Sequence, residues 1–202
     1  VMPRFAPAVK VDNTRRFGAT VVLEGDTFDD ARAHGLALAQ ERGLTIVHPY
    51  DDLAVAAGQG TVALEMLAQQ PAIDTLLVAV GGGGLVTGVA TAAAGVKPGT
   101  QVFGVQTERF PAMVNAIKGT HLPQGSSTIA EGIAVGTPGE VNLPIVRERV
   151  DDLLLVDEGD IEQAIVMLLE IEKTLVEGAG AAGLAALLKH PKRFAGRRVG
   201  LV

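Results

Sequence analysis

The sequence contains no cysteine, which excludes disulfide bonds, thiolate zinc sites and cysteine nucleophiles together. Aromatic residues are scarce as well: they form 3% of the 202 residues, and there is no tryptophan. Hydrophobic residues nevertheless reach 48%, so a sizeable core must be built from alanine, valine, leucine and isoleucine. A cytoplasmic location fits this composition.

Strong charge of one sign and long apolar runs are also missing. The net charge is −6 and the acidic and basic residues are interspersed, which argues against nucleic acid or an anionic membrane surface as a partner. No apolar run approaches the roughly 20 residues that a membrane-spanning helix needs, and no signal peptide is visible. We therefore expect no nucleic acid and no membrane among the partners.

Short β-branched apolar runs alternate with helical patterns along the chain. Several runs are apolar at consecutive residues, as in strands buried on both faces of a parallel sheet. Strands are predicted at residues 20–24, 45–48, 75–80, 101–105, 153–157 and 198–202. Helices are predicted at residues 7–17, 29–42, 58–69, 85–95, 111–118, 143–150, 159–175 and 181–190. This alternation predicts an α/β fold with a mostly parallel sheet flanked by helices.

Three features bear on the organisation of the chain. The pattern Thr27-x-x-Asp30 resembles a capping box at the start of the second predicted helix. A change near residues 44–52, which contain Pro49, marks either the end of a small N-terminal unit or another loop. The chain opens on Val1 and closes on the strand-like residues 199–202, and we expect both ends to be cut because a buried strand needs partners on either side.

The strongest local signal is a run of glycines between a strand and a helix. The apolar residues 74–80 lead into Gly81, Gly82, Gly83 and Gly84, and a helix rich in small residues follows from Leu85. Glycine lets the backbone wrap closely around a ligand, and the N-terminus of a helix favours an anion. The alternative is a tight turn that needs glycine for packing, but four consecutive glycines exceed that need. The pattern therefore favours a bound phosphate at the carboxyl end of a parallel strand.

The common nucleotide patterns do not fit this loop. No Lys-Ser or Lys-Thr pair follows the glycines, so the P-loop pattern fails. The dinucleotide spacing requires glycine or alanine where the chain has Val86. Residue spacing alone thus leaves the identity of the phosphate ligand open.

A second glycine-rich segment, residues 177–183, leads into another predicted helix. Glu177 at its start either contacts a ligand or is an acid favoured there by the helix dipole, and the sequence does not decide between these readings. The four histidines are scattered without metal-ligand spacing, and the serines at 126 and 127 lack a nucleophile-elbow pattern. The acidic pairs at 29–30, 51–52 and 151–152 have the pattern of caps or solvated loop ends.

The motifs of the chain, in their order, resemble the threonine/serine dehydratase (threonine ammonia-lyase) family of pyridoxal-phosphate enzymes. The resemblance covers essentially the whole chain. The segments that carry it are Val1-Met2-Pro3, Ala6-Pro7, Lys10, His48-Pro49-Tyr50-Asp51-Asp52, residues 57–65, residues 80–85, Gly104-Val105-Gln106-Thr107-Glu108, Ala130-Glu131-Gly132, Val150-Asp151-Asp152 and residues 176–181.

The resemblance implies the two-domain tryptophan-synthase-β-like fold, also called fold type II of pyridoxal-phosphate enzymes. Residues 1–47 would be the later part of the small domain, and residues 48–202 would form an incomplete large domain that binds the cofactor phosphate. Gly81, Gly82, Gly83, Gly84 and Leu85 would hold the phosphate of pyridoxal 5'-phosphate. Gly132 would lie near the face of the pyridine ring, with Glu177 beside it.

The chemistry implied by the family is loss of water from the β-carbon of a small amino-acid substrate, with the cofactor as electron sink. Threonine would yield 2-oxobutanoate and ammonia, and serine would yield pyruvate. The family also implies a homo-oligomer, a dimer or a tetramer, and a role in amino-acid metabolism such as isoleucine biosynthesis. The alternatives are serine racemase, another β-eliminating enzyme of this fold, or a non-catalytic remnant.

Some residues of the family pattern are not in this chain. The lysine that binds the cofactor covalently, and the asparagine at the ring hydroxyl, belong to family segments upstream of Val1, and a Ser or Cys facing the ring nitrogen belongs after Val202. We therefore expect no catalytic residue among residues 1–202, and no turnover by these residues alone. Gln106 stands where relatives with a metal site carry a glutamate, so we expect no divalent metal site.

Overall fold

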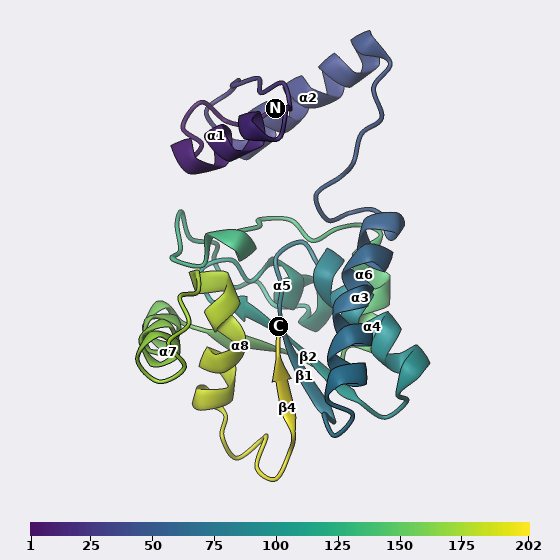
Figure 1. Ribbon diagram of the computed structural model, residues 1–202, viewed down its shortest axis with the longest axis vertical. Coiled ribbons are helices and arrows are strands. Elements are labelled where there is room, and N and C mark those ends of the chain that lie inside the picture. The colour runs from purple at the N-terminus through teal and green to yellow at the C-terminus, as the bar shows by residue number, and fades with distance from the viewer. The chain divides into compact units, whose positions relative to one another are not determined.

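The computed structural model describes residues 1–202, except for the side chains of Phe28 and Asp29. The α-carbons group into two compact units, Val1–Val47 and His48–Val202. Figure 1 traces the chain through both of them.

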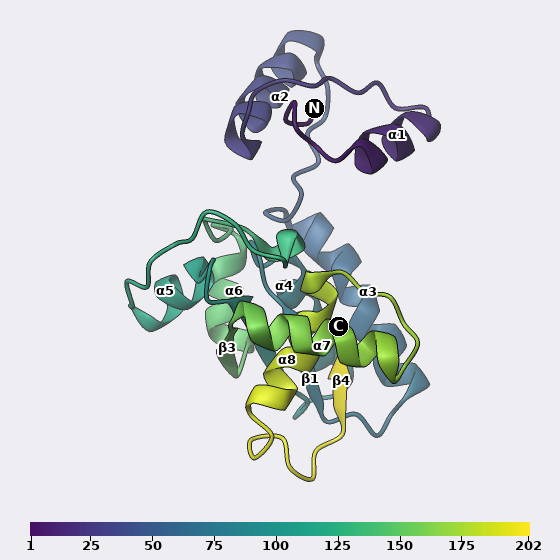
Figure 2. The same cartoon turned by 90° about the vertical axis from the view of Figure 1, so that its left-hand side faces the viewer.

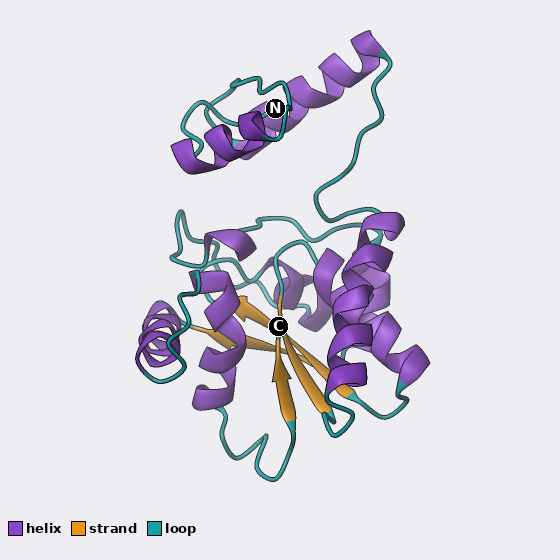
Figure 3. Cartoon of the chain, in the orientation of Figure 1, coloured by secondary structure: helices purple, strands orange, loops and turns teal.

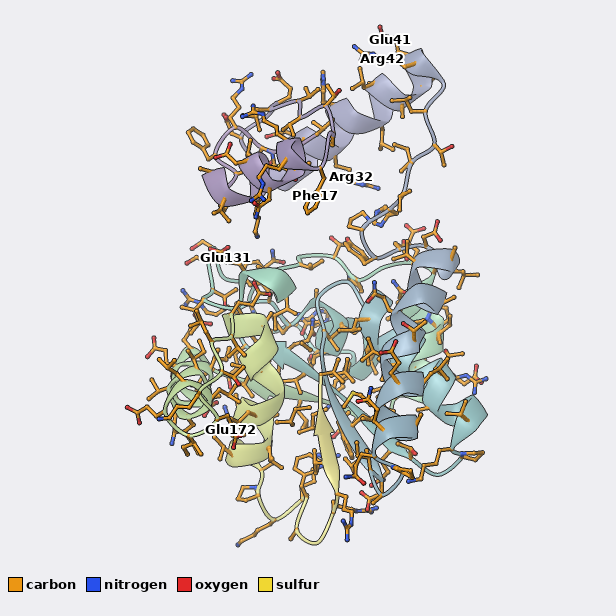
Figure 4. All side chains as sticks on the ribbon, viewed as in Figure 1. Phe17, Arg32, Glu41, Arg42, Glu131 and Glu172 are labelled. Atoms are coloured by element: carbon orange, nitrogen blue, oxygen red, sulfur yellow. The ribbon has the colours of Figure 1, made fainter. Side chains whose placement is uncertain are left out.

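The first unit contains the helices α1 (Ala8–Arg16) and α2 (Phe28–Arg42). The predicted capping box is confirmed: Asp30 N donates to Thr27 Oγ1 at 3.2 Å, and Thr27 N donates to Asp30 Oδ2 at 3.0 Å. Phe17, labelled in Figure 4, follows α1 and is 90% exposed.

The strands predicted at residues 20–24 and 45–48 are wrong. In the first segment an isolated parallel bridge joins Leu23 to Met2, and residues 45–48 form no ladder. A β-branched run becomes a strand when a neighbouring backbone offers a continuous row of donors and acceptors. Within the described residues, neither segment has such a neighbour.

The second unit is built on a four-stranded parallel sheet, shown in orange in Figure 3. Its strands are β1 (Thr75–Ala79), β2 (Gln101–Thr107), β3 (Asp152–Val156) and β4 (Val199–Leu201). They lie in the order β3-β2-β1-β4, and Thr75 at the start of β1 pairs with Gln101 and with Val199. Every residue of β1 is buried, which confirms the expectation of a strand covered on both faces.

Helices cover both faces of this sheet. They are α3 (Leu53–Gln69), α4 (Gly84–Val96), α5 (Ala112–Lys118), α6 (Asn142–Arg149), α7 (Glu158–Glu170) and α8 (Gly178–Lys189), with a 3-10 turn, η1 (Glu131–Ile133). Figures 1 and 2 place α7 and α8 on one side of the strands and α3, α4 and α6 on the other. Two apolar clusters form the core, one on each face of the sheet.

Three helix boundaries differ from the predicted ones. The helix α3 begins at Leu53 because the Asp52 carboxylate accepts the N–H of Ala54 at 2.7 Å and caps the first turn. The helix α7 ends at Glu170, and Lys173 then takes a left-handed φ of 56°. The second glycine cluster lies inside α8, which begins at Gly178. None of the helices in the described part of the chain has the length and apolarity needed to cross a membrane.

Candidate functional site

The loop of residues 81–84, which we call the glycine loop, connects the carboxyl end of β1 to the first turn of α4. Gly83 is the N-cap residue of α4, with a φ of 101°. Among the backbone–backbone hydrogen bonds of the described residues, none has the N–H of Gly81, Gly82, Gly84 or Leu85 as its donor, and Gly83 N–H is likewise not used. Because the helix dipole adds positive potential here, the loop can bind an anion such as a phosphate.

The structure gives each glycine of the loop a packing or conformational reason. A β-carbon at Gly82 would collide with the ring of Tyr50, and one at Gly84 would lie 2.6 Å from Tyr50 O. Gly83 has a left-handed φ, and a β-carbon at Gly81 would lie 2.9 Å from Val135 Cγ2. The expectation that four glycines exceed the needs of packing is therefore wrong. The capacity for an anion rests on the N–H groups and the helix N-terminus instead.

The other predicted site residues meet at the same edge of the sheet. A β-carbon at Gly81 would lie 3.3 Å from Ile133 Cα and 3.6 Å from Gly132 O. A β-carbon at Gly132 would in turn lie 2.9 Å from Glu177 Oε1. The glycine loop, the η1 turn and the start of α8 are thus in mutual contact. Leu85 is next to the loop in α4, and its side chain packs against the core.

Glu177 is the N-cap residue of α8, but its side chain makes no capping hydrogen bond. Its carboxylate lies beside Gly132 instead. Of the two readings of this residue, a side-chain cap is therefore not what the structure has, although the negative charge still lies at the positive end of the helix dipole.

Glu158 supports the segment that leads into η1, and sequence reasoning missed this residue. Its carboxylate accepts hydrogen bonds from Thr128 Oγ1 at 2.7 Å, Ile129 N at 2.8 Å and Thr107 Oγ1 at 3.2 Å. Partial burial acts to raise the pKa of Glu158, but these hydrogen bonds together outweigh it, so the pKa lies below its ordinary value. The available signal was an acid in the first turn of α7, which sequence alone explains by the helix dipole.

The acidic pair Asp51 and Asp52 behaves as predicted, as caps. Asp52 caps α3, and the Asp51 carboxylate accepts the N–H groups of Glu140 and Val141 at 3.0 and 2.9 Å, just before α6. Asp51 thereby ties the segment before α3 to the start of α6 across 90 residues of sequence.

The structure offers no alternative site in the residues predicted to be silent. His48 accepts the N–H of Asp51 through Nδ1 at 2.8 Å. Gln106 is buried, its Nε2 donates to Val80 O at 3.2 Å, and its Oε1 accepts the N–H of Val114 at 2.9 Å. Within the described residues, no group of three or more His, Asp or Glu side chains is arranged to hold a metal ion.

The lysine side chains with recorded contacts have their ammonium groups bound away from the glycine loop. Lys97 donates to Pro71 O at 2.6 Å, Lys118 pairs with Asp152 at 2.7 Å, and Lys173 donates to Glu170 O at 2.6 Å. Lys189 pairs with Asp160 at 2.6 Å. Lys10 and Lys192 are exposed.

Comparison with known proteins gives one consistent result. The chain is 42% identical over 204 residues to an L-threonine ammonia-lyase of Thermotoga maritima, covering 100% of this chain and 51% of the relative. In structure it matches a threonine deaminase from the organism abbreviated T.th., with a TM-score of 0.86 and 38% identity over 95% of this chain and 64% of the other. It also matches maize serine racemase, with a TM-score of 0.88 and 32% identity over 98% of this chain and 62% of the other.

The chain thus spans about half the length of the curated relative that it matches in full. The solved structures confirm the α/β fold with a parallel sheet flanked by helices. Residues 1–202 as a whole match the family described as pyridoxal-phosphate dependent enzymes. The anion-binding loop fits the phosphate of that cofactor, and the chain belongs to the pyridoxal-phosphate dependent enzyme family.

Proposed function

We propose that the protein containing this chain is a pyridoxal-phosphate-dependent ammonia-lyase. It converts L-threonine to 2-oxobutanoate and ammonia and, more weakly, L-serine to pyruvate and ammonia. The observation that carries the proposal is the similarity of the whole chain to an L-threonine ammonia-lyase, at 42% identity. The identity to maize serine racemase is lower, 32%, which makes racemisation of serine the second candidate.

The residues proposed to hold the cofactor are those of the glycine loop and its neighbours. The N–H groups of Gly81, Gly82, Gly83, Gly84 and Leu85 bind the phosphate, and the N-terminus of α4 stabilises its negative charge. Gly132 leaves room at the face of the pyridine ring, with Glu177 beside it. When bound, the cofactor supplies an electron sink for cleavage of bonds at the α- and β-carbons of an amino acid.

The proposal extends to the organisation of the protein. Residues 1–47 form the later part of a small domain, and residues 48–202 belong to a large domain that binds the cofactor phosphate. This division is supported by the two compact units of the fold. The protein is a homo-oligomer, a dimer or a tetramer, in the cytoplasm. Light scattering and cell fractionation test these last two points.

The function is tested on the full-length protein, reconstituted with pyridoxal phosphate. We expect an imine absorbance band and threonine-dependent release of 2-oxobutanoate, with slower release of pyruvate from serine. A folded, cofactor-loaded protein that releases no 2-oxo acid from either substrate contradicts the proposal. Formation of D-serine at a rate above that of threonine deamination favours the racemase instead.

None of the six lysines in this chain is proposed as the residue that forms the imine. Four of them have ammonium groups engaged elsewhere, and the other two are exposed. Residues 1–202 expressed alone are therefore expected to show no imine absorbance and no turnover. Either signal from these residues alone contradicts this part of the proposal.

A further inference from the structure

Asn142 is a fully buried polar residue at the start of α6, next to the glycine loop. Its exposed fraction is 0%. Removing an amide from water costs free energy unless it is hydrogen-bonded, so the bonds of this side chain indicate what it stabilises. A β-carbon at Gly83 would lie 3.0 Å from Asn142 Cβ, which places the residue directly against the loop.

The neighbours of Asn142 determine which way its amide points. Asn142 Nδ2 lies 2.8 Å from Tyr50 O, 3.4 Å from Gly82 O and 3.5 Å from Asp51 Oδ1. All three atoms are acceptors, so the group that faces them must be the NH₂ donor. Asn142 Oδ1 is buried and has no hydrogen-bond partner within the described part of the chain. The side chain therefore acts as a donor toward the loop.

The bond to Gly82 O fixes one peptide plane of the glycine loop. Gly82 O also accepts the N–H of Gly139 at 2.9 Å. The Gly82–Gly83 peptide is trans and planar, so its C=O and its N–H point in opposite directions. Two donors that hold Gly82 O toward α6 consequently hold the N–H of Gly83 away from α6. Because both residues are glycines, little else opposes rotation of this peptide.

The donor itself is held in place from both sides of the loop. Asp51 accepts the N–H groups of Glu140 and Val141, and Tyr50 O accepts Asn142 Nδ2. The segment before α3, the start of α6 and the glycine loop are thus joined by one set of hydrogen bonds. A change at position 142 acts on the loop without removing any of its N–H groups.

We propose that Asn142 is a positioning residue for the phosphate site. It holds the Gly82–Gly83 peptide in the orientation that presents the N–H of Gly83, and not the carbonyl of Gly82, to the phosphate of the cofactor. This inference rests on the proposed function of the glycine loop. The readout that follows from it is the contribution of the phosphate to binding, which a general loss of stability does not change selectively.

The test compares binding of pyridoxal phosphate and of pyridoxal, which lacks the phosphate, to the full-length apo protein in phosphate-free buffer. In N142A we expect the affinity for pyridoxal phosphate to fall roughly tenfold or more, the size expected when a hydrogen bond to a charged group is lost. The affinity for pyridoxal should change little. The ³¹P resonance of the bound cofactor should shift relative to that of the wild-type protein.

N142D keeps the volume of the side chain but places a carboxylate against three acceptor oxygens, so we expect a loss at least as large. If N142A does not fold, N142T, which retains one donor, is expected to show a smaller loss in the same direction. N115A is the matched control, because Asn115 ties residues 120 and 122 through its side-chain amide at 2.8–3.0 Å. It should leave both affinities unchanged.

Two negative results have different meanings. A wild-type protein that binds both compounds equally contradicts the proposed phosphate site itself. A wild-type protein that prefers pyridoxal phosphate, together with N142A and N142D variants that keep the same preference, overturns the role of Asn142 and leaves the phosphate site standing.

Discussion

Gly132 has no room for a side chain on the flank that faces Glu177, because a β-carbon there would lie 2.9 Å from Glu177 Oε1. The same β-carbon would lie 3.0 Å from Ala179 Cβ. The η1 turn and the start of α8 are therefore packed as closely as glycine allows. This close approach joins two segments 45 residues apart at the edge of the sheet where we propose the cofactor ring (177 − 132 = 45).

We predict that G132A weakens binding of pyridoxal phosphate, because the added methyl group displaces Glu177 or presses on α8. Overpacking of this kind costs about 1–3 kcal/mol. Cofactor titration of the full-length apo protein measures the loss. The double variant G132A/E177A should recover part of it, since removing the carboxylate relieves one of the two contacts. An additive double variant would show that Glu177 is not the obstacle.

The glycine loop should be far less tolerant of alanine than the end of α4. G84A places a methyl group 2.6 Å from Tyr50 O, and we expect it to lower stability by about 1–3 kcal/mol and to weaken cofactor binding. G95A is the matched control in the same helix, where a β-carbon meets nothing within 4 Å. It should be neutral or stabilise by up to about 1 kcal/mol. Thermal unfolding compares the two, and equal effects would contradict the packing of Tyr50 on the loop.

Glu158 should contribute stability that depends on pH. Its pKa lies below the ordinary value of 4.5, since hydrogen bonds from Thr128, Ile129 and Thr107 outweigh partial burial. A lowered pKa in the folded state means that the contribution is complete above about pH 4.5 and is lost as the pH falls through the lower, folded value. E158Q should therefore be destabilised near neutral pH and should lose less stability on acidification than the wild type. Parallel acid titrations of the two proteins would contradict this role.

A cluster at the opposite end of β3 should affect stability without affecting the site. Asp152 pairs with Lys118 at 2.7 Å and with Arg193 at 2.7 Å, and Arg193 lies over the Phe103 ring at 4.8 Å. Partial burial acts to raise the pKa of Asp152, and the hydrogen bonds from Lys118 and Arg193 lower it below its ordinary value.

We expect D152N to destabilise the protein by about 1–3 kcal/mol, because two cations lose their carboxylate partner. Denaturant unfolding measures this loss. The affinity for pyridoxal phosphate, measured under conditions where the variant is folded, should stay within about twofold of the wild type, a difference below about 0.5 kcal/mol. A larger loss of affinity would show that the sheet transmits strain from β3 to the glycine loop.

Much of the second unit was predictable because its signals are local. Strand β1 is apolar at every residue after Thr75, and the run of glycines that follows can end a strand and begin a helix without reference to any distant residue. The capping box at Thr27 is equally local, since both of its hydrogen bonds lie within four residues. The strand predicted at residues 20–24 failed for the opposite reason, because a strand depends on a partner elsewhere in the chain.

The amino-acid sequence by itself determined the strand–glycine–helix order, the helix caps and the resemblance to a pyridoxal-phosphate family. Only the tertiary structure decided that Gly132 meets Glu177, that Glu158 holds the segment before η1, and that Asn142 reaches Gly82 across 60 residues of sequence. Periodicity and propensity report on neighbours within a few residues of each other. Contacts between distant segments depend on how the sheet and helices pack, and that packing selects which buried amide faces which carbonyl.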